Sequence, residues 1–96
     1  KRLEELGVFA LVLECVPAEL SASAAKAVKC PVIGIGAGTA VDGQVLVLHD
    51  MLGFESGVRP RFVRKYAALA EETREAVREY IEDIASGKFP SKEESY

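Results

Sequence analysis

Two unbroken apolar runs, at residues 8–13 and 32–35, constrain the fold of this chain more than any other feature. Apolar and polar residues alternate in a strand that has one face in water, but they do not alternate in either run. Each run is therefore predicted to form a strand that is buried on both faces. An alanine-rich segment at residues 18–28 separates them, and Pro17 suits the first position of a helix there. Strand, helix and strand in this order predict an α/β fold with a parallel sheet.

Further elements are predicted before and after these two strands. Residues 1–6 fit the last turns of a helix that the following glycine ends. A third apolar run, residues 45–48, is interpreted as another strand, although the nine residues before it are too few for a crossover with a helix. The alternative interpretation is a helix that Asp42 caps, that runs to residue 52 and that Gly53 ends.

The second half of the chain has a helical period. From residue 61 onward, one set of positions recurs at steps of three and four, which predicts a helix over residues 61–86 with a break near residues 69–70. Gly87 ends this helix, and a polar tail follows. The recurring positions are expected to pack against a core or a partner, while the charged face lies in solvent. They are Phe62, Tyr66, Leu69, Thr73, Val77, Tyr80 and Ile84.

The composition excludes several classes of protein. Twelve Lys and Arg residues against fifteen Asp and Glu residues give a net charge of −3, unlike a strongly basic nucleic-acid-binding protein. The hydrophobic share of 49% argues against disorder, and the longest apolar run is far too short for a membrane span. Two cysteines and one histidine nearly exclude a zinc site of such ligands. We therefore expect a reduced, cytoplasmic protein without nucleic-acid or membrane partners.

Candidate functional residues follow the predicted strands, because parallel α/β sheets collect functional groups at the carboxyl ends of their strands. Three such ends are expected to face one mouth: Glu14, the loop at residues 36–38, and the pair His49 and Asp50. Glu14 is the most informative of these. A carboxylate that directly follows a buried strand is partly removed from water, which suits it to proton transfer. From spacing alone, a helix cap or an ion pair with an arginine is an equally good interpretation.

The glycine loop and the histidine carry weaker signals. The segment Gly34-Ile-Gly-Ala-Gly38 lacks the third glycine of a dinucleotide fingerprint, since Thr39 stands in its place, and it lacks the lysine of a nucleotide P-loop. Close backbone packing is therefore the favoured role of these glycines. His49 and Asp50 could form an acid–base pair, but neighbours on a strand point to opposite faces, so a structural role for His49 is favoured.

Longer motifs resemble a known family. The segments LVLECVPAEL (11–20), PVIGIGAG (31–38) and DGQVLVLHDMLG (42–53) occur in this order, and RFVRKYA, AVREYIEDIASGKFP and EESY follow them. Together they resemble the ketopantoate hydroxymethyltransferase family over essentially the whole chain. Three long motifs in order are much more specific than a single glycine pattern.

The resemblance implies the fold of a (β/α)8 TIM barrel of the phosphoenolpyruvate mutase and isocitrate lyase superfamily. Such a barrel needs about 250 residues. This chain would be the C-terminal portion of that single barrel domain. Residues 1–53 would supply the last barrel strands and loops, residues 60–87 the C-terminal helical region, and residues 88–96 the tail.

The resemblance also implies an activity. The family transfers a hydroxymethyl group from 5,10-methylenetetrahydrofolate to 3-methyl-2-oxobutanoate, which yields 2-dehydropantoate in pantothenate biosynthesis, and it uses Mg²⁺. Glu14 matches the glutamate that acts in proton transfer, whereas the magnesium ligands belong to earlier strands, so no metal ligand is expected here. Folate contacts are not assigned. The implied partners are the remainder of the barrel and further copies in a homo-oligomer, and the chain alone is expected to be inactive. The alternative is a non-catalytic α/β fragment that acts as an oligomerisation module.

Overall fold

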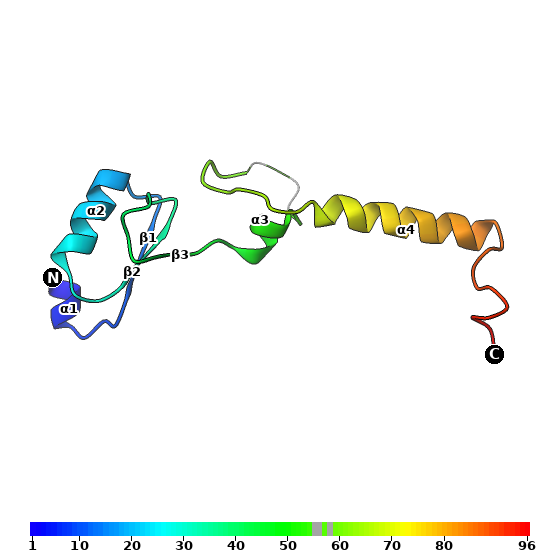
Figure 1. Cartoon of the computed structure of the whole chain (residues 1–96), viewed down its shortest axis with the longest axis horizontal. Coiled ribbons are helices and arrows are strands. Elements are labelled where there is room, and N and C mark those ends of the chain that lie inside the picture. Colours follow the sequence, from blue (N-terminus) through cyan, green and yellow to red (C-terminus); the bar gives the residue numbers. More distant parts are fainter. Residues whose placement is uncertain (55–56, 58) are drawn as a thin grey trace.

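A computed structural model describes residues 1–54, 57 and 59–96. A small sheet and two helices form its amino-terminal part, and a long helix extends away from them toward the carboxyl terminus (Figure 1). The molecule measures 67 × 29 × 16 Å along its principal axes. The elements are α1 (Arg2–Glu5), β1 (Leu11–Glu14), α2 (Ala18–Ala27), β2 (Val32–Ile35), β3 (Gly43–Gln44), α3 (Leu48–Leu52) and α4 (Leu69–Ala85).

The sheet is parallel, as predicted, with strand order β1-β2-β3. Leu11 pairs with Val32 and Glu14 with Ile35, so β1 and β2 end side by side. The strand β2 has the predicted bounds and supplies two of the four buried hydrophobic residues among those described, Val32 and Ile35. Helix α2 begins directly after Pro17, which is its N-cap rather than its first residue. The α/β pattern and its parallel pairing are therefore confirmed.

The strand β1 differs from the prediction in two respects. It begins at Leu11 rather than at residue 8, and its residues are not buried on both faces. Val12 is 65% exposed, and Phe9, just before the strand, is 90% exposed. Continuous apolarity predicts burial only when other elements cover both faces of a strand. In the structure, part of the apolar surface of β1 lies open.

The predicted strand at residues 45–48 is wrong. The third strand is β3 (Gly43–Gln44), and it leaves the sheet after Val45 donates a backbone hydrogen bond to the Gly34 carbonyl (3.0 Å). The chain then enters α3, which ends at Gly53 with φ +73°. The alternative helix is correct in this ending but not in its start. The Asp42 carboxylate accepts a hydrogen bond from the Val32 N–H (2.8 Å) instead of capping a helix.

The long helix α4 begins at Leu69, so the predicted break near residues 69–70 is its start and the prediction of a helix over residues 61–68 is wrong. Backbone hydrogen bonds hold the preceding segment against α3 in place of a helical ladder. The Tyr66 N–H donates to the Met51 carbonyl (2.8 Å) and the Ala70 N–H to that of Gly53 (3.2 Å). The predicted ending is confirmed, because Gly87 has φ +70°.

The amino-terminal helix is fastened by one carboxylate. Residues 1–6 form the predicted helical turns, and Gly7 follows with φ +89°. The Glu4 carboxylate accepts hydrogen bonds from the backbone N–H groups of Lys29 and Cys30, which lie 25 and 26 residues further along the chain. These N–H groups, Lys29 first, lower the pKa of Glu4 below its ordinary value, although desolvation opposes them. The contact ties α1 to the loop between α2 and β2.

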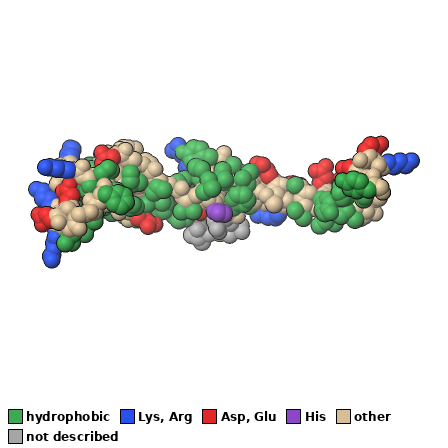
Figure 2. Space-filling view, turned by 90° about the horizontal axis from the view of Figure 1, so that it is seen from below, with side chains coloured by type: hydrophobic (Ala, Val, Ile, Leu, Met, Phe, Trp, Pro, Cys, Tyr) green, Lys and Arg blue, Asp and Glu red, His purple; other side chains and the backbone are tan. Residues whose placement is uncertain are grey.

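Apolar side chains are exposed along the whole molecule (Figure 2). In α4, Val77, Tyr80 and Ile84 are each about half exposed, so the helix presents the predicted stripe without cover from the described residues. The rings of Tyr80 and Phe89 lie with 5.3 Å between their centroids. Within the described ranges, none of the helices combines the length and the apolarity that crossing a membrane requires.

Candidate functional site

Glu14 occupies the carboxyl end of β1, as the sequence predicts. Its partner in the register is Ile35, the last residue of β2. Its side chain is exposed, which corrects the expectation that it is partly removed from water. The cause is the open face of β1, since the described elements leave this end of the strand uncovered.

A strained residue follows Glu14 directly. Cys15 has φ +55°, the only positive φ of a non-glycine residue among the described positions. Such a conformation is uncommon for a residue with a Cβ and is concentrated at functional sites. The Cys15 N–H donates to the Ile35 carbonyl (2.9 Å), so the ladder between β1 and β2 continues through the turn. This hydrogen bond fixes the backbone beside Glu14.

The glycine loop after β2 has the close packing that its sequence predicts. Gly36 has φ +62°, and a Cβ there would lie 2.7 Å from Cδ1 of Phe62. Gly38 has φ +80°, and a Cβ there would lie 2.6 Å from the Cβ of Ala18. Both positions therefore require glycine for conformation and for space. The loop brings the start of α2 and the segment before α4 to the same end of the sheet.

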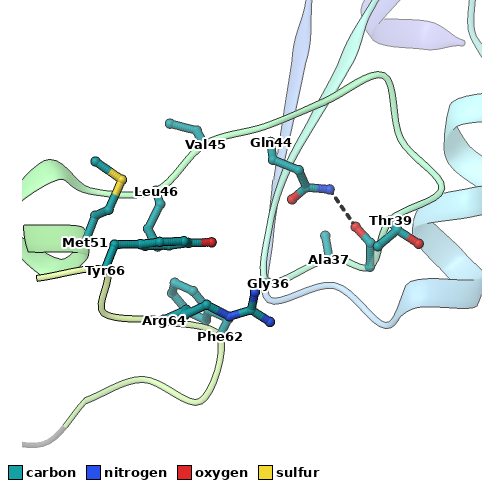
Figure 3. A pocket seen from close by; sticks show the side chains of 11 residues that line it. Gly36, Ala37, Thr39, Gln44, Val45, Leu46, Met51, Phe62, Arg64 and Tyr66 are labelled. Carbon is teal, nitrogen blue, oxygen red and sulfur yellow. Dashed lines mark hydrogen bonds between the residues drawn. The ribbon is translucent and has the colours of Figure 1, made fainter.

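A hollow of about 550 Å³ opens at this end of the sheet (Figure 3). The glycine loop and Gln44 form one side, and the Gln44 Nε2 donates to the Gly38 carbonyl (2.8 Å). Leu46, Met51, Arg64 and Tyr66 approach from the other side. Its full lining is Gly36, Ala37, Gly38, Thr39, Gln44, Val45, Leu46, Met51, Phe62, Arg64 and Tyr66. A hollow of this volume is in the range of small-molecule sites.

The predicted common mouth forms only in part. Glu14 and the glycine loop lie on adjacent strand ends, although Glu14 is not among the residues that line the hollow. His49 and Asp50 are on α3 rather than at a strand end, so their predicted place in the mouth is wrong. The His49 ring instead packs near that of Phe54, with 5.5 Å between centroids. This contact agrees with the structural role favoured for the histidine.

Sequence reasoning missed Arg64 and Tyr66. Both fall within the helix predicted from residue 61, whereas in the structure they lie on an irregular segment that returns to the sheet. Pro60 and the density of cations around it are the signals that could have separated this segment from the helix.

A magnesium site does not fit the residues described. Across residues 1–54, 57 and 59–96, no three Asp, Glu, His or Cys side chains gather in a way that could hold a metal ion. Mg²⁺ needs carboxylate oxygens in near-octahedral geometry. The hollow itself is lined by amide, hydroxyl, guanidinium and apolar groups.

Comparisons with known proteins agree with the motifs. The model of the family described as ketopantoate hydroxymethyltransferase matches residues 1–92. A 3-methyl-2-oxobutanoate hydroxymethyltransferase from Parabacteroides distasonis is 61% identical over 94 residues, which are 98% of this chain and 34% of that protein. The enzyme of the same name from Wolinella succinogenes is 58% identical over 96 residues, all of this chain and 37% of that protein. The chain thus spans about a third of the length of the curated relatives it matches.

Proposed function

Because this chain belongs to the ketopantoate hydroxymethyltransferase family, we propose that it is the C-terminal part of an enzyme that transfers a hydroxymethyl group. The donor is 5,10-methylenetetrahydrofolate, the acceptor is 3-methyl-2-oxobutanoate, and the product is 2-dehydropantoate, an intermediate of pantothenate biosynthesis. The enzyme is a cytoplasmic homo-oligomer. The names of the relatives include this acceptor, 3-methyl-2-oxobutanoate, and the transfer of a hydroxymethyl group.

The whole enzyme is a (β/α)8 barrel of the phosphoenolpyruvate mutase and isocitrate lyase superfamily, and this chain provides its last strands and its C-terminal helices. The parallel order β1-β2-β3 supports this proposal, because barrel strands are parallel and meet their neighbours on both sides. The exposed apolar side chains of β1 support it as well, since preceding strands and helices would cover them.

The placement of Glu14 is the observation that carries the proposed chemistry. Active sites of (β/α)8 barrels lie at the carboxyl ends of the strands, and Glu14 is the last residue of β1. A Glu14 carboxylate oxygen accepts the proton from C3 of the keto acid. The electron pair left on C3 then forms a bond to the methylene carbon of the donor. Both carbon–nitrogen bonds of that carbon break in the overall reaction, their electron pairs stay on the folate nitrogens, which take up protons, and water supplies the hydroxyl group. The positive φ of Cys15 supports this role, because it holds the backbone in place behind the carboxylate.

Magnesium, when bound, would chelate the keto acid and stabilise its enolate. The described residues do not offer a site for it, so its ligands belong to other parts of the enzyme. The hollow beside the glycine loop is large enough for a ligand much bigger than the keto acid, which supports its assignment to the folate donor.

Glu14→Gln in the enzyme that contains this chain tests the role of the carboxylate. We expect turnover to fall about 10²–10⁴-fold, the usual contribution of a general acid–base group. Exchange of the C3 proton of the keto acid into D₂O, measured by NMR without the folate donor, should fall in parallel. Glu19→Gln is the matched control, because it makes the same change on the exposed surface of α2. Turnover of Glu14→Gln within about threefold of the wild type would contradict the assignment.

A second function is favoured by one observation, the uncovered apolar stripe of α4. In this alternative, the chain is a non-catalytic α/β fragment that holds copies together. Loss of the α4 segment should lower the mass of the assembly, measured by light scattering, under both proposals. Exchange of the C3 proton that depends on Glu14 separates them, because it is expected only in the catalytic one.

A further inference from the structure

Two backbone N–H groups converge on one carboxylate oxygen at the entry into β2. Lys29 and Cys30 follow α2, which ends at Ala27. Their N–H groups, the N–H pair, both donate to Oε1 of Glu4 in α1. Pro31 comes next, and a residue before proline is restricted to extended conformations, which limits how the Cys30 backbone can turn. Successive N–H groups that point at one place form an anion-binding concavity.

The N–H pair suits a charged ligand. It lowers the pKa of Glu4 below its ordinary value, with the Lys29 N–H as the largest cause, so the carboxylate is bound in preference to the carboxylic acid. The positive charge of the Lys29 side chain acts in the same direction. Hydrogen bonds to an ionised acceptor are roughly twice as strong as those between neutral groups. A carboxylate is therefore the class of ligand that the pair selects.

This place lies at the opposite end of the sheet from the proposed reacting group. Glu14 is the last residue of β1, whereas the N–H pair comes before Val32, the first residue of β2, which runs parallel to β1. The hydrogen bond from Lys29 to Glu4 is exposed, and the one from Cys30 is partly buried. A small anion from solution can therefore reach the pair from its exposed side.

We propose that the N–H pair is a carboxylate-binding site and that Glu4 is its built-in ligand. Glu4 reaches the pair through its side chain, whereas Asp42 is held to Val32 twice, by its carboxylate and by its own N–H (2.9 Å). Glu4 can thus leave while the sheet stays intact, which makes α1 a releasable latch on the entry into β2. A small carboxylate such as acetate takes its place once the Glu4 side chain is removed.

Removal of the built-in ligand tests the site. In the enzyme that contains this chain, Glu4→Ala should speed hydrogen exchange in peptides that cover residues 26–33 roughly tenfold, because two N–H groups lose their acceptor. Sodium acetate should bring exchange back to within about threefold of the wild type, since a bound ligand stabilises the state that it binds. Sodium chloride at the same concentration should not. Glu5→Ala, at the adjacent exposed position of α1, is the matched control and should exchange like the wild type in either salt.

A second variant keeps the test decisive if Glu4→Ala does not fold. Glu4→Gln retains an oxygen at the same place without the charge, so we expect exchange about threefold faster than in the wild type. Equal exchange in Glu4→Gln and the wild type would show that the pair does not recognise charge and would overturn the inference. Equal slowing of Glu4→Ala by acetate and chloride would overturn it as well. Turnover is not the readout, so a failure of the proposed function would leave this result unchanged.

Discussion

The turn after β1 joins a carboxylate to a strained backbone. Glu14 ends the strand in register with Ile35, and Cys15 then adopts φ +55° while its N–H continues the ladder. The place of Glu14 at a strand end follows from the apolar run before it. Its exposure does not, because exposure depends on elements that lie elsewhere in space. The conformation of Cys15 could not be predicted, since cysteine is not a residue type that signals a left-handed turn.

The strain at Cys15 is measurable by substitution in the enzyme that contains this chain. Cys15→Gly removes the Cβ that disfavours the positive φ, so we expect the free energy of unfolding to stay the same or to rise. Cys15→Val places a β-branched residue there and should lower it by about 1–3 kcal/mol. Thermal unfolding of both variants is the measurement, and Cys30→Val, at the other cysteine, is the control. A Val variant as stable as the Gly variant would show that the turn is not strained.

At the scale of elements, apolarity alone did not distinguish a strand from a loop that leads into a helix. The run at residues 45–48 fits a strand by residue type, yet Val45 makes the last hydrogen bond to the sheet and Leu48 begins α3. The hydrogen bond between the Val32 N–H and the Asp42 carboxylate lies at the start of β3, and no hydrophobic periodicity predicts it. The long helix α4 was predictable in its core because its period is sustained. The start of α4 was less predictable, because residues 61–68 share the helical period of hydrophobic positions, yet their backbone hydrogen-bonds to α3.

The stripe of α4 is expected to be an assembly surface in the enzyme that contains this chain. Val77→Asp places a charge at the amino-terminal end of the exposed apolar positions Val77, Tyr80 and Ile84. Burial of an unpaired charge is costly, so we expect the oligomer to dissociate at a concentration at which the wild type remains assembled. Analytical ultracentrifugation measures this effect. Glu79→Lys changes a charge on the opposite side of the helix and should leave the oligomer mass unaltered. An unchanged oligomer mass for Val77→Asp would show that this stripe of α4 is not part of the interface between subunits.

At the scale of the molecule, the chain does not close on itself. Its radius of gyration is 22.3 Å, whereas a compact domain of this length has about 13 Å. Both β1 and β3 are edge strands, and large apolar side chains are exposed from the first helix to the last. A sequence predicts elements from local patterns, but closure requires partners for every apolar face. In this chain, the described helices and strands expose more apolar surface than they can cover among themselves.

The isolated chain of 96 residues is therefore expected to lack a stable monomeric fold. Open strand edges and apolar patches favour association, so size-exclusion chromatography with light scattering should find oligomers or aggregates. Heating should give no cooperative transition, and the chain should show no hydroxymethyl transfer. A monomer that unfolds cooperatively, or that turns over substrate, would contradict this expectation.

The contact between Gly36 and Phe62 has a consequence for how such sequences can diverge. A methyl group at position 36 would lie 2.7 Å from the ring at position 62 and 2.9 Å from the Cβ there, and φ +62° disfavours any side chain at 36. A smaller side chain at 62 therefore does not make room for a larger residue at 36. Aligned relatives should retain glycine at the first position whatever side chain occupies the second.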